Sequence, residues 1–203
     1  DAIPIKQFER EDKSLLEKYF TLKKDYNIKE DFRKASHKDE KFINSFSSTK
    51  NLKFIEFPKF GFEELKKIIK MISLNQGCLL LIDYGYLEPK NKNTLQSVIK
   101  HKKNNLLNNL GKADVTSHVN FTLLKEFFLK NKLKVKKIVT QKEFLEQMGI
   151  LDRAEIISKK MKFSDKTNLY LRLRRLLSSK LMGNLFKVIL AYNFKNDDYF
   201  GFN

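Results

Sequence analysis

The sequence has few cysteines and no long apolar runs, and each absence narrows the class of protein. Its single cysteine, Cys78, cannot form an internal disulfide and supplies no cysteine-based metal site. The neighbours of Cys78 are apolar, which predicts a small core residue. No apolar run approaches the roughly 18 residues that a membrane-spanning helix needs. A length of 203 residues suits one domain, or one domain with an embellishment.

The common catalytic signatures are absent as well. The chain has no glycine-rich phosphate-binding loop, no Gly-x-Ser-x-Gly and no His-Glu-x-x-His. It has three histidines, His37, His101 and His118, and their spacing matches no familiar metal site. We therefore expect no bound metal.

Acidic residues are scarce relative to basic ones. The chain has 41 Lys and Arg against 24 Asp and Glu, a formal net charge of +17. Such a charge suggests nucleic-acid binding. However, the lysines are spread over the whole chain and do not coincide with the aromatic pattern of an RNA-binding sheet. We expect solvated surfaces, and the alternative that stays open is a non-catalytic basic module that binds an anionic or protein partner.

A helix followed by a strand is the clearest pattern in the chain. The apolar residues from 62 to 72 are spaced as one helix face. Residues 79–82 form an apolar run without alternation, which predicts a strand covered on both faces. Asp83 follows directly. Because ligands bind at the carboxyl ends of strands in open α/β sheets, Asp83 is either a turn residue or a site residue.

Periodicity and capping residues predict the remaining elements. We expect two strands in 14–33 around a turn at 25–27, a short helix near 42–46, and strands over 52–58, 94–101, 133–140 and 184–193. We also expect helices over 121–131 with Asn120 as N-cap, over 141–149 with Gly149 as C-cap, and over 152–161 and 166–179.

Three polar residues alternate in the segment 113–118. In an extended chain, Asp114, Thr116 and His118 would face one side. A carboxylate, a hydroxyl and an imidazole on one side could orient a ligand, or could satisfy backbone groups of a loop. The residues alone leave both interpretations open.

Several segments together resemble a known family. They are "DAIPIKQF", "LLIDYGY", "TLQ", "ADVTSHVNF", "VTQKEFLEQMGILDRA" and "MGNLFKV", in this order. The chain resembles the MidA-like S-adenosylmethionine-dependent methyltransferases, relatives of the mitochondrial complex I assembly protein arginine methyltransferase. The resemblance covers nearly the whole chain.

This resemblance implies an α/β fold: a partial Rossmann-like methyltransferase fold, with a mixed sheet, helices on both faces and a small helical cap. Residues 1–203 would be the C-terminal portion of a class I methyltransferase domain. Residues 14–50 would be an insertion and residues 141–177 the helical cap. The last strand would be antiparallel, near an edge.

The resemblance also implies S-adenosyl-L-methionine as cofactor. In the family, a glycine-rich cofactor loop precedes an Asn-Glu-x-x-Asp-Ala-x-Pro motif, and the chain begins inside that motif at Asp1. The loop, the acid that would bind the ribose and the Asn-Glu pair are not in the sequence. We therefore expect that these 203 residues do not methylate anything by themselves.

The same resemblance assigns the candidate site residues. Asp1, Asp83 and Tyr84 are the catalytic candidates, with the two carboxylates as a clamp for a guanidinium. Pro4 is the cofactor-binding candidate. The substrate-binding candidates are Gln7, His101, Asp114, Thr116 and His118.

The function implied is methylation of a protein, at arginine, in respiratory complex assembly. The expected partners are a protein substrate and a second copy in a homodimer, without nucleic acid and without a membrane span. The expected compartment is the bacterial cytoplasm, or the mitochondrial matrix if the source is eukaryotic.

Overall fold

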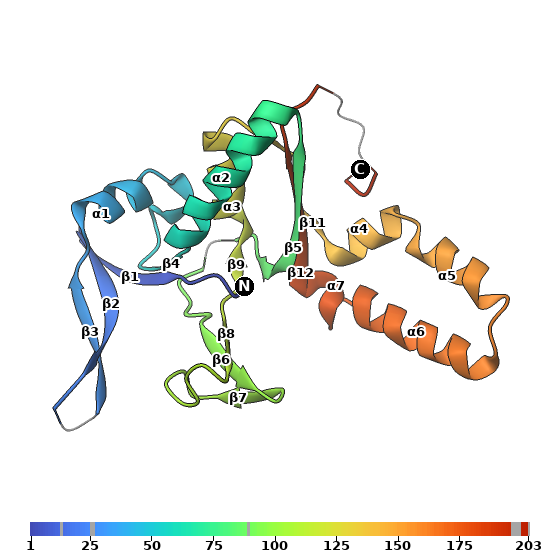
Figure 1. Ribbon diagram of the computed structural model, residues 1–203, viewed down its shortest axis with the longest axis horizontal. Helices are drawn as coiled ribbons and strands as arrows, with labels where there is room; N and C mark the ends of the chain where they lie inside the picture. The colour runs from blue at the N-terminus through green and yellow to red at the C-terminus, as the bar shows by residue number, and fades with distance from the viewer. Residues whose placement is uncertain (13, 25–26, 89, 196–199, 203) are drawn as a thin grey trace. The chain divides into compact units, whose positions relative to one another are not determined.

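Figure 1 shows the computed structural model, which describes residues 1–12, 14–24, 27–88, 90–195 and 200–202. The chain divides into two compact units. The first contains residues 1–68 and 87–127, and the second contains residues 69–86 and 128–203.

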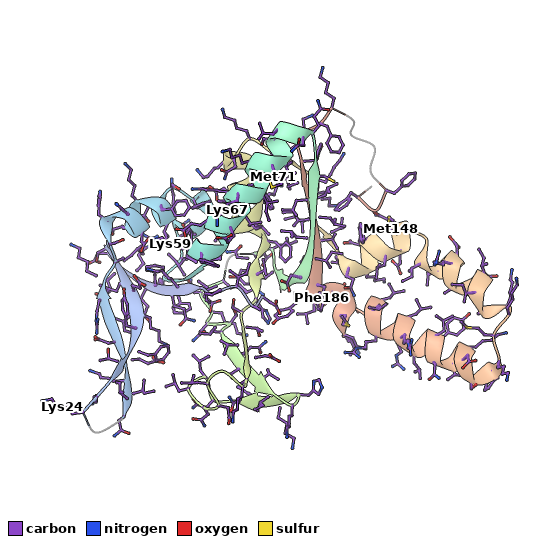
Figure 2. The ribbon with its side chains drawn as sticks, in the orientation of Figure 1. Lys24, Lys59, Lys67, Met71, Met148 and Phe186 are labelled. Carbon is purple, nitrogen blue, oxygen red and sulfur yellow. The ribbon has the colours of Figure 1, made fainter. Side chains whose placement is uncertain are left out.

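The first unit is built on an antiparallel sheet in the order β3-β2-β1-β4. Its strands are β1 (Lys6–Glu11), β2 (Ser14–Leu22), β3 (Ile28–Lys34) and β4 (Phe54–Phe57). β2 and β3 form the predicted hairpin, and Lys24 lies at its tip (Figure 2). Residues 25 and 26 of the predicted turn lie outside the described residues.

Helices and phenylalanines complete the core of this unit. The helical elements are α1 (His37–Asn44), the 3₁₀ turn η1 (Ser47–Thr49), the start of α2 (Lys59–Asn75) and most of α3 (Phe121–Lys130). The Phe62 and Phe127 rings stack with centroids 4.0 Å apart. Phe42, Phe46 and Phe57 meet Phe62 at centroid distances of 5.4–6.4 Å. As predicted, Asn120 caps α3, since its Oδ1 accepts from Leu123 N.

A small second sheet in the first unit has the order β7-β6-β8. β6 (Gln96–Ile99) lies between β7 (Lys102–Asn104) and β8 (Asp114–Thr116), and the two-residue β9 (Val119–Asn120) precedes α3. The β6–β7 turn has Lys100 and His101 in the left-handed region, with φ of 50° and 61°. The predicted strand at 94–101 is therefore confirmed as the shorter β6.

The second unit contains a sheet centred on β12 (Phe186–Tyr192) and β5 (Cys78–Tyr86), which pair in antiparallel register over seven residues. On its other side β12 pairs with two short strands, β10 (Lys134–Val135) and β11 (Val139–Thr140). β12 is antiparallel and near an edge, as expected. The single strand predicted over 133–140 is divided in two.

The expectation for β5 was wrong in two respects. The strand continues three residues beyond Asp83, to Tyr86, so Asp83 lies within it. One of its faces is exposed, and Cys78 is an exposed thiol and not a core residue. The apolar run shows that both faces of the strand are hydrophobic. It does not show whether another element covers each face.

Among the described residues, four helices lie wholly within the second unit: α4 (Gln141–Gln147), α5 (Ile150–Ser158), α6 (Phe163–Leu177) and the unpredicted α7 (Met182–Leu185). Thr140 and Glu143 form a capping box at the start of α4. Gly149 was expected to cap α4, but Met148 is that cap. Gly149, with φ of 75°, instead begins α5. Its left-handed backbone turns the chain between the two helices.

Among the described residues, no helix is both long and apolar enough to cross a membrane. Nor does that part of the chain gather three His, Cys, Asp or Glu side chains where they could hold a metal ion.

Candidate functional site

The first residues of the chain are hydrogen-bonded to the segment that follows β8. The backbone carbonyl of Asp1 accepts a hydrogen bond from Ser117 N at 3.1 Å, and Asp1 Oδ1 accepts from Ala2 N at 2.7 Å. Gly61 in α2 allows the first residues of the chain to lie close to this helix, because a Cβ at Gly61 would be 2.9 Å from Ile3 Cγ2. Pro4 is exposed. The structure therefore places the Asp1–Pro4 segment beside the segment that carries His118.

A buried polar pair lies where β1 meets β4. Gln7 and Glu56 are opposite each other in the antiparallel register, and both side chains are buried. Gln7 Nε2 donates to Glu56 Oε1 at 3.0 Å and to Asn93 Oδ1 at 2.8 Å. Buried polar groups need such partners, because a missing one costs the full desolvation penalty.

Glu56 extends this pair into a network. Its carboxylate accepts from Thr94 N at 3.0 Å, from Leu95 N at 3.2 Å and from Thr94 Oγ1. Thr94 Oγ1 in turn accepts from His118 N at 3.0 Å. The network therefore holds the loop before β6 and the backbone of His118 in fixed positions relative to β1 and β4.

The other substrate-binding candidates lie in the small sheet. Asp114 and Thr116 occupy alternate positions of β8, so they share one face of that strand, and Thr116 Oγ1 accepts from Gln96 Nε2 at 3.3 Å. His118 lies two residues after the end of β8. His101 is exposed in the β6–β7 turn. Hydrogen bonds within the first unit connect Gln7, through Glu56 and Thr94, to the backbone of His118.

The remaining catalytic candidates, Asp83 and Tyr84, belong to the second unit. Asp83 Oδ1 accepts from Tyr84 N at 2.8 Å, and Asp83 is opposite Lys187 in the β5–β12 register. The Tyr84 ring meets Phe186 edge to face, with centroids 5.7 Å apart. β5 and β12 thus hold both candidate side chains on a paired strand, and not on a loop.

An ion-pair cluster adjoins the start of β1. Asp39 is buried and contacts Lys59 Nζ at 2.6 Å and Lys6 Nζ at 3.1 Å, and Lys6 also contacts Glu17 at 2.8 Å. Burial acts to raise the pKa of Asp39, but the hydrogen bonds and charges of the two lysines outweigh it and leave that pKa lowered. Lys59 lies at the beginning of α2 (Figure 2). The cluster joins β1, α1 and α2.

Sequence reasoning missed Glu56 and Asn93, although a signal for Glu56 was present. It is the one acid in the apolar strand "FIEF", between Ile55 and Phe57. A carboxylate in a short apolar strand requires strong partners, because burying an unpaired charge is costly. Asn93 lies in a polar loop of similar residues and carried no comparable signal.

The glycines of the chain do not form a glycine-rich cofactor loop. The sequence has seven glycines, none adjacent to another. Two of them serve chain packing: a Cβ at Gly61 would meet Ile3, and one at Gly183 would lie 2.3 Å from the Leu177 carbonyl oxygen. Neither leaves room for a ligand.

The comparison with protein families identifies the family of the chain. Residues 1–139 match the family described as "Putative S-adenosyl-L-methionine-dependent methyltransferase". The chain belongs to this family.

Curated relatives carry a more specific description. The chain is 29% identical over 156 residues to the "Protein arginine methyltransferase NDUFAF7 homolog, mitochondrial" of Caenorhabditis elegans. This match covers 75% of the chain and 36% of the relative. It is 30% identical over 96 residues to "Protein arginine methyltransferase NDUFAF7, mitochondrial" of Xenopus tropicalis, which covers 47% of the chain and 22% of the relative.

Solved structures confirm the expected fold class. A Burkholderia thailandensis protein, in its native crystal structure, matches with a TM-score of 0.78 and 19% identity over 100% of this chain and 54% of that one. A crystal structure from the same organism, bound to S-adenosyl-homocysteine, matches with a TM-score of 0.77 and 19% identity over 100% and 52%. The chain thus spans about half the length of these proteins, and about a third of the C. elegans relative.

Proposed function

We propose that the chain is the acceptor-side portion of an S-adenosyl-L-methionine-dependent methyltransferase that modifies a protein at arginine. The observation that carries this proposal is the family match over residues 1–139. The proposal that the methyl acceptor is an arginine of a protein rests on the names of the two relatives. The family favours this enzyme over a non-catalytic basic module.

The chemistry of the acceptor accounts for the carboxylates. A guanidinium presents a planar fork of N–H donors, which a carboxylate can accept in two parallel, charge-assisted hydrogen bonds. Asp1 lies in the first unit and Asp83 in the second, so we propose each of them separately for this contact. Holding the acceptor in one orientation is what the chain's own residues can contribute to the rate.

Other residues are proposed for support of the acceptor. Tyr84 is held against Phe186 and could shape the acceptor's surroundings. The Gln7–Glu56–Thr94 network would set the position of His118, and His118, Thr116 and Asp114 would contact the protein substrate. His101 and Pro4, which are exposed, stay predictions. The helical cap of residues 141–177, the insertion of residues 14–50 and a homodimer also stay predictions.

The role in respiratory complex assembly and the compartment are proposals too. Both relatives are named mitochondrial, which supports a mitochondrial matrix location if the source is eukaryotic. The bacterial cytoplasm stays the prediction otherwise.

Calorimetry with S-adenosyl-L-methionine tests the proposal. We would titrate this chain and a version that includes the coding sequence upstream of Asp1. We expect binding by the longer version only, because this sequence does not contain the glycine-rich cofactor loop of the family that it resembles. The longer version should then transfer a labelled methyl group to an arginine peptide and not to its lysine-substituted counterpart. No binding by either version would contradict the proposal and favour the non-catalytic module.

A further inference from the structure

The antiparallel sheet of the first unit ends in a strand with a neighbour on one side. In the order β3-β2-β1-β4, β3 pairs with β2, and no strand among the described residues pairs with its other edge. Figure 1 shows β3 and β2 as a long hairpin within this unit. An edge strand offers its main-chain N–H and C=O groups to a strand of another chain. β3 is therefore a candidate for such pairing.

The main-chain groups that face this edge belong to alternate residues of β3. In an antiparallel pair, hydrogen-bonded and non-hydrogen-bonded positions alternate along each strand. The hydrogen bond from Ala35 N to Leu15 O, at 2.8 Å, fixes this alternation, because it shows that Ala35 bonds toward β2. The odd-numbered residues of β3 therefore bond toward β2 as well. The even-numbered residues direct their N–H and C=O groups to the edge: Ile28, Glu30, Phe32 and Lys34.

The charges of β3 are arranged so that the strand complements itself. Two acids precede one aromatic residue and two bases follow it: Glu30, Asp31, Phe32, Arg33 and Lys34. We consider two copies of β3 in antiparallel orientation, with a twofold axis at Phe32. Glu30 then lies opposite the second copy's Lys34. Asp31 lies opposite the second copy's Arg33, and the axis generates each of these contacts twice.

This register also agrees with the main-chain groups. It places even-numbered residues opposite even-numbered ones, so the N–H and C=O groups at the two edges can bond to each other. An axis at any charged residue of β3 would place that residue opposite its own copy, and like charges directly opposite each other destabilise a strand pair. An axis at Ile28, the end of β3, would leave most of the strand outside the pairing. The axis at Phe32 is therefore the favoured one.

The charged side chains of β3 are accessible for these contacts. The side chains of Glu30, Asp31 and Arg33 are 56%, 40% and 54% exposed. Glu30 contacts Lys18 at 2.8 Å, and Asp31 contacts Arg33 at 3.0 Å. A carboxylate has two oxygens, each of which can accept more than one hydrogen bond. The second copy's bases can therefore extend these ion pairs and need not replace them.

We propose that β3 is the interface of a homodimer, in which two copies of this strand pair about a twofold axis at Phe32. The occupant of the edge is a second copy of this chain, because β3 itself carries the complementary charges in the complementary order. The two sheets then join into one. This interface gives the predicted homodimer a specific surface. It goes beyond the proposed methyltransferase function and does not depend on it.

Two charge reversals test the interface by sedimentation equilibrium. In the dimer, Asp31→Lys places two cations opposite each other, and Arg33→Asp places two anions opposite each other. We expect the dimer dissociation constant of each variant to be at least about tenfold higher than that of the unsubstituted protein. In an equimolar mixture, each substituted residue faces an opposite charge on the other variant. Mixed dimers should therefore form with about the affinity of the unsubstituted protein.

Glu63→Lys is the matched control for Asp31→Lys. Glu63 is exposed on α2 in the same unit, and its substitution makes the same change in net charge. The dimer dissociation constant should stay unchanged. A protein that is monomeric over the whole concentration range would overturn the proposal. So would a dimer that neither reversal weakens, or a mixture in which affinity does not recover.

Cross-linking supplies a test that keeps the charges opposite Phe32 in place. Cys78→Ser removes the sole cysteine. In this background, Phe32→Cys places the thiols of the two copies at the axis. The Cα atoms of a hydrogen-bonded pair are about 5.5 Å apart, within the range of a disulfide. Oxidation with diamide should therefore yield a covalent dimer.

Glu30→Cys, in the same background, is the control for the register. In the proposed dimer its two copies lie four residues apart along the strands, about 13 Å, which is too far for a disulfide. Equal cross-linking at both positions would overturn the proposed axis. These outcomes are separate from the test of methyl transfer. A dimer with the expected charge dependence that binds no S-adenosyl-L-methionine would contradict the proposed function alone, and binding by a monomer would contradict the interface alone.

Discussion

Gln7 lies directly opposite Glu56 in the β1–β4 pair, and its side-chain amide donates to the Glu56 carboxylate at 3.0 Å. The same carboxylate receives both backbone N–H groups of Thr94 and Leu95. Glu56 is therefore one residue by which the sheet fixes the loop before β6. Thr94 Oγ1 accepts a hydrogen bond from His118 N, so the network also includes the backbone of His118.

The first prediction concerns Glu56→Gln. The new amide can accept at one oxygen only, and its NH₂ group would face other donors. We expect a loss of about 1–3 kcal/mol in the free energy of unfolding, the cost of leaving buried donors unpaired. Urea unfolding followed by circular dichroism would measure it. The backbone amides of Thr94 and Leu95 should also exchange their hydrogens faster.

Glu63→Gln is the matched control for Glu56→Gln. Glu63 is exposed on α2, so its substitution should change the free energy of unfolding by less than about 0.5 kcal/mol. Unchanged exchange at Thr94 and Leu95 in Glu56→Gln would show that the loop is held by other contacts.

The second prediction is a pH dependence that originates at Asp39. The pKa of this carboxyl is lowered from its usual 3.8, because the hydrogen bonds from Lys59 and Lys6 outweigh its burial. A lowered pKa in the folded protein gives a stabilisation that is complete above the pKa of the unfolded chain. It is lost as the pH falls through the folded-state pKa.

Asp39→Asn tests this dependence. At pH 6 the variant should be less stable by about 1–2 kcal/mol, a small figure because both lysine side chains are about one-third exposed. The difference from the unsubstituted protein should shrink as the pH is lowered toward 2.5. Urea midpoints over this range would measure it, and a difference that stays constant with pH would contradict the assignment to Asp39.

The sequence predicted local structure well where periodicity and capping act over a few residues. The β2–β3 hairpin, α2 and the Asn120 cap of α3 are examples, since each depends on neighbouring residues. The exposed face of β5 could not be predicted in this way, because burial depends on elements distant in the sequence. Leu80 looks the same in a sequence whether or not a helix lies over it.

The candidate site was predicted unevenly for a related reason. The family resemblance indicated Gln7, Asp83 and His118, and the structure gives Gln7 and the backbone of His118 a common network. Glu56 and Asn93 escaped notice because they are 49 and 86 residues from Gln7. Only the pairing of β1 with β4 brings Glu56 opposite Gln7.

The third prediction concerns Gly183 in α7. A Cβ at this position would lie 2.3 Å from Leu177 O and 2.8 Å from Ser178 O, which are backbone atoms that cannot move aside easily. Gly183→Ala should cost about 1–3 kcal/mol or more of unfolding free energy. Gly77→Ala is the control in the same unit, because its nearest contacts are ordinary ones at 3.7 Å. Equal thermal stability of the two variants would contradict the close approach at α7.

The last prediction concerns the charge of Asp83. In Asp83→Asn the side chain keeps an oxygen that can accept from Tyr84 N, so β5 should retain its geometry and only the negative charge is removed. In the version of the enzyme that binds S-adenosyl-L-methionine, we expect KM for an arginine peptide to rise at least tenfold. This corresponds to about 1.5–3 kcal/mol for a hydrogen bond to a charged group.

Asp165→Asn is the control, because Asp165 is an exposed carboxylate in the first turn of α6. This substitution should leave KM unchanged. An unchanged KM in Asp83→Asn, with an unchanged melting temperature, would remove Asp83 from the acceptor site and leave Asp1 as the carboxylate to test.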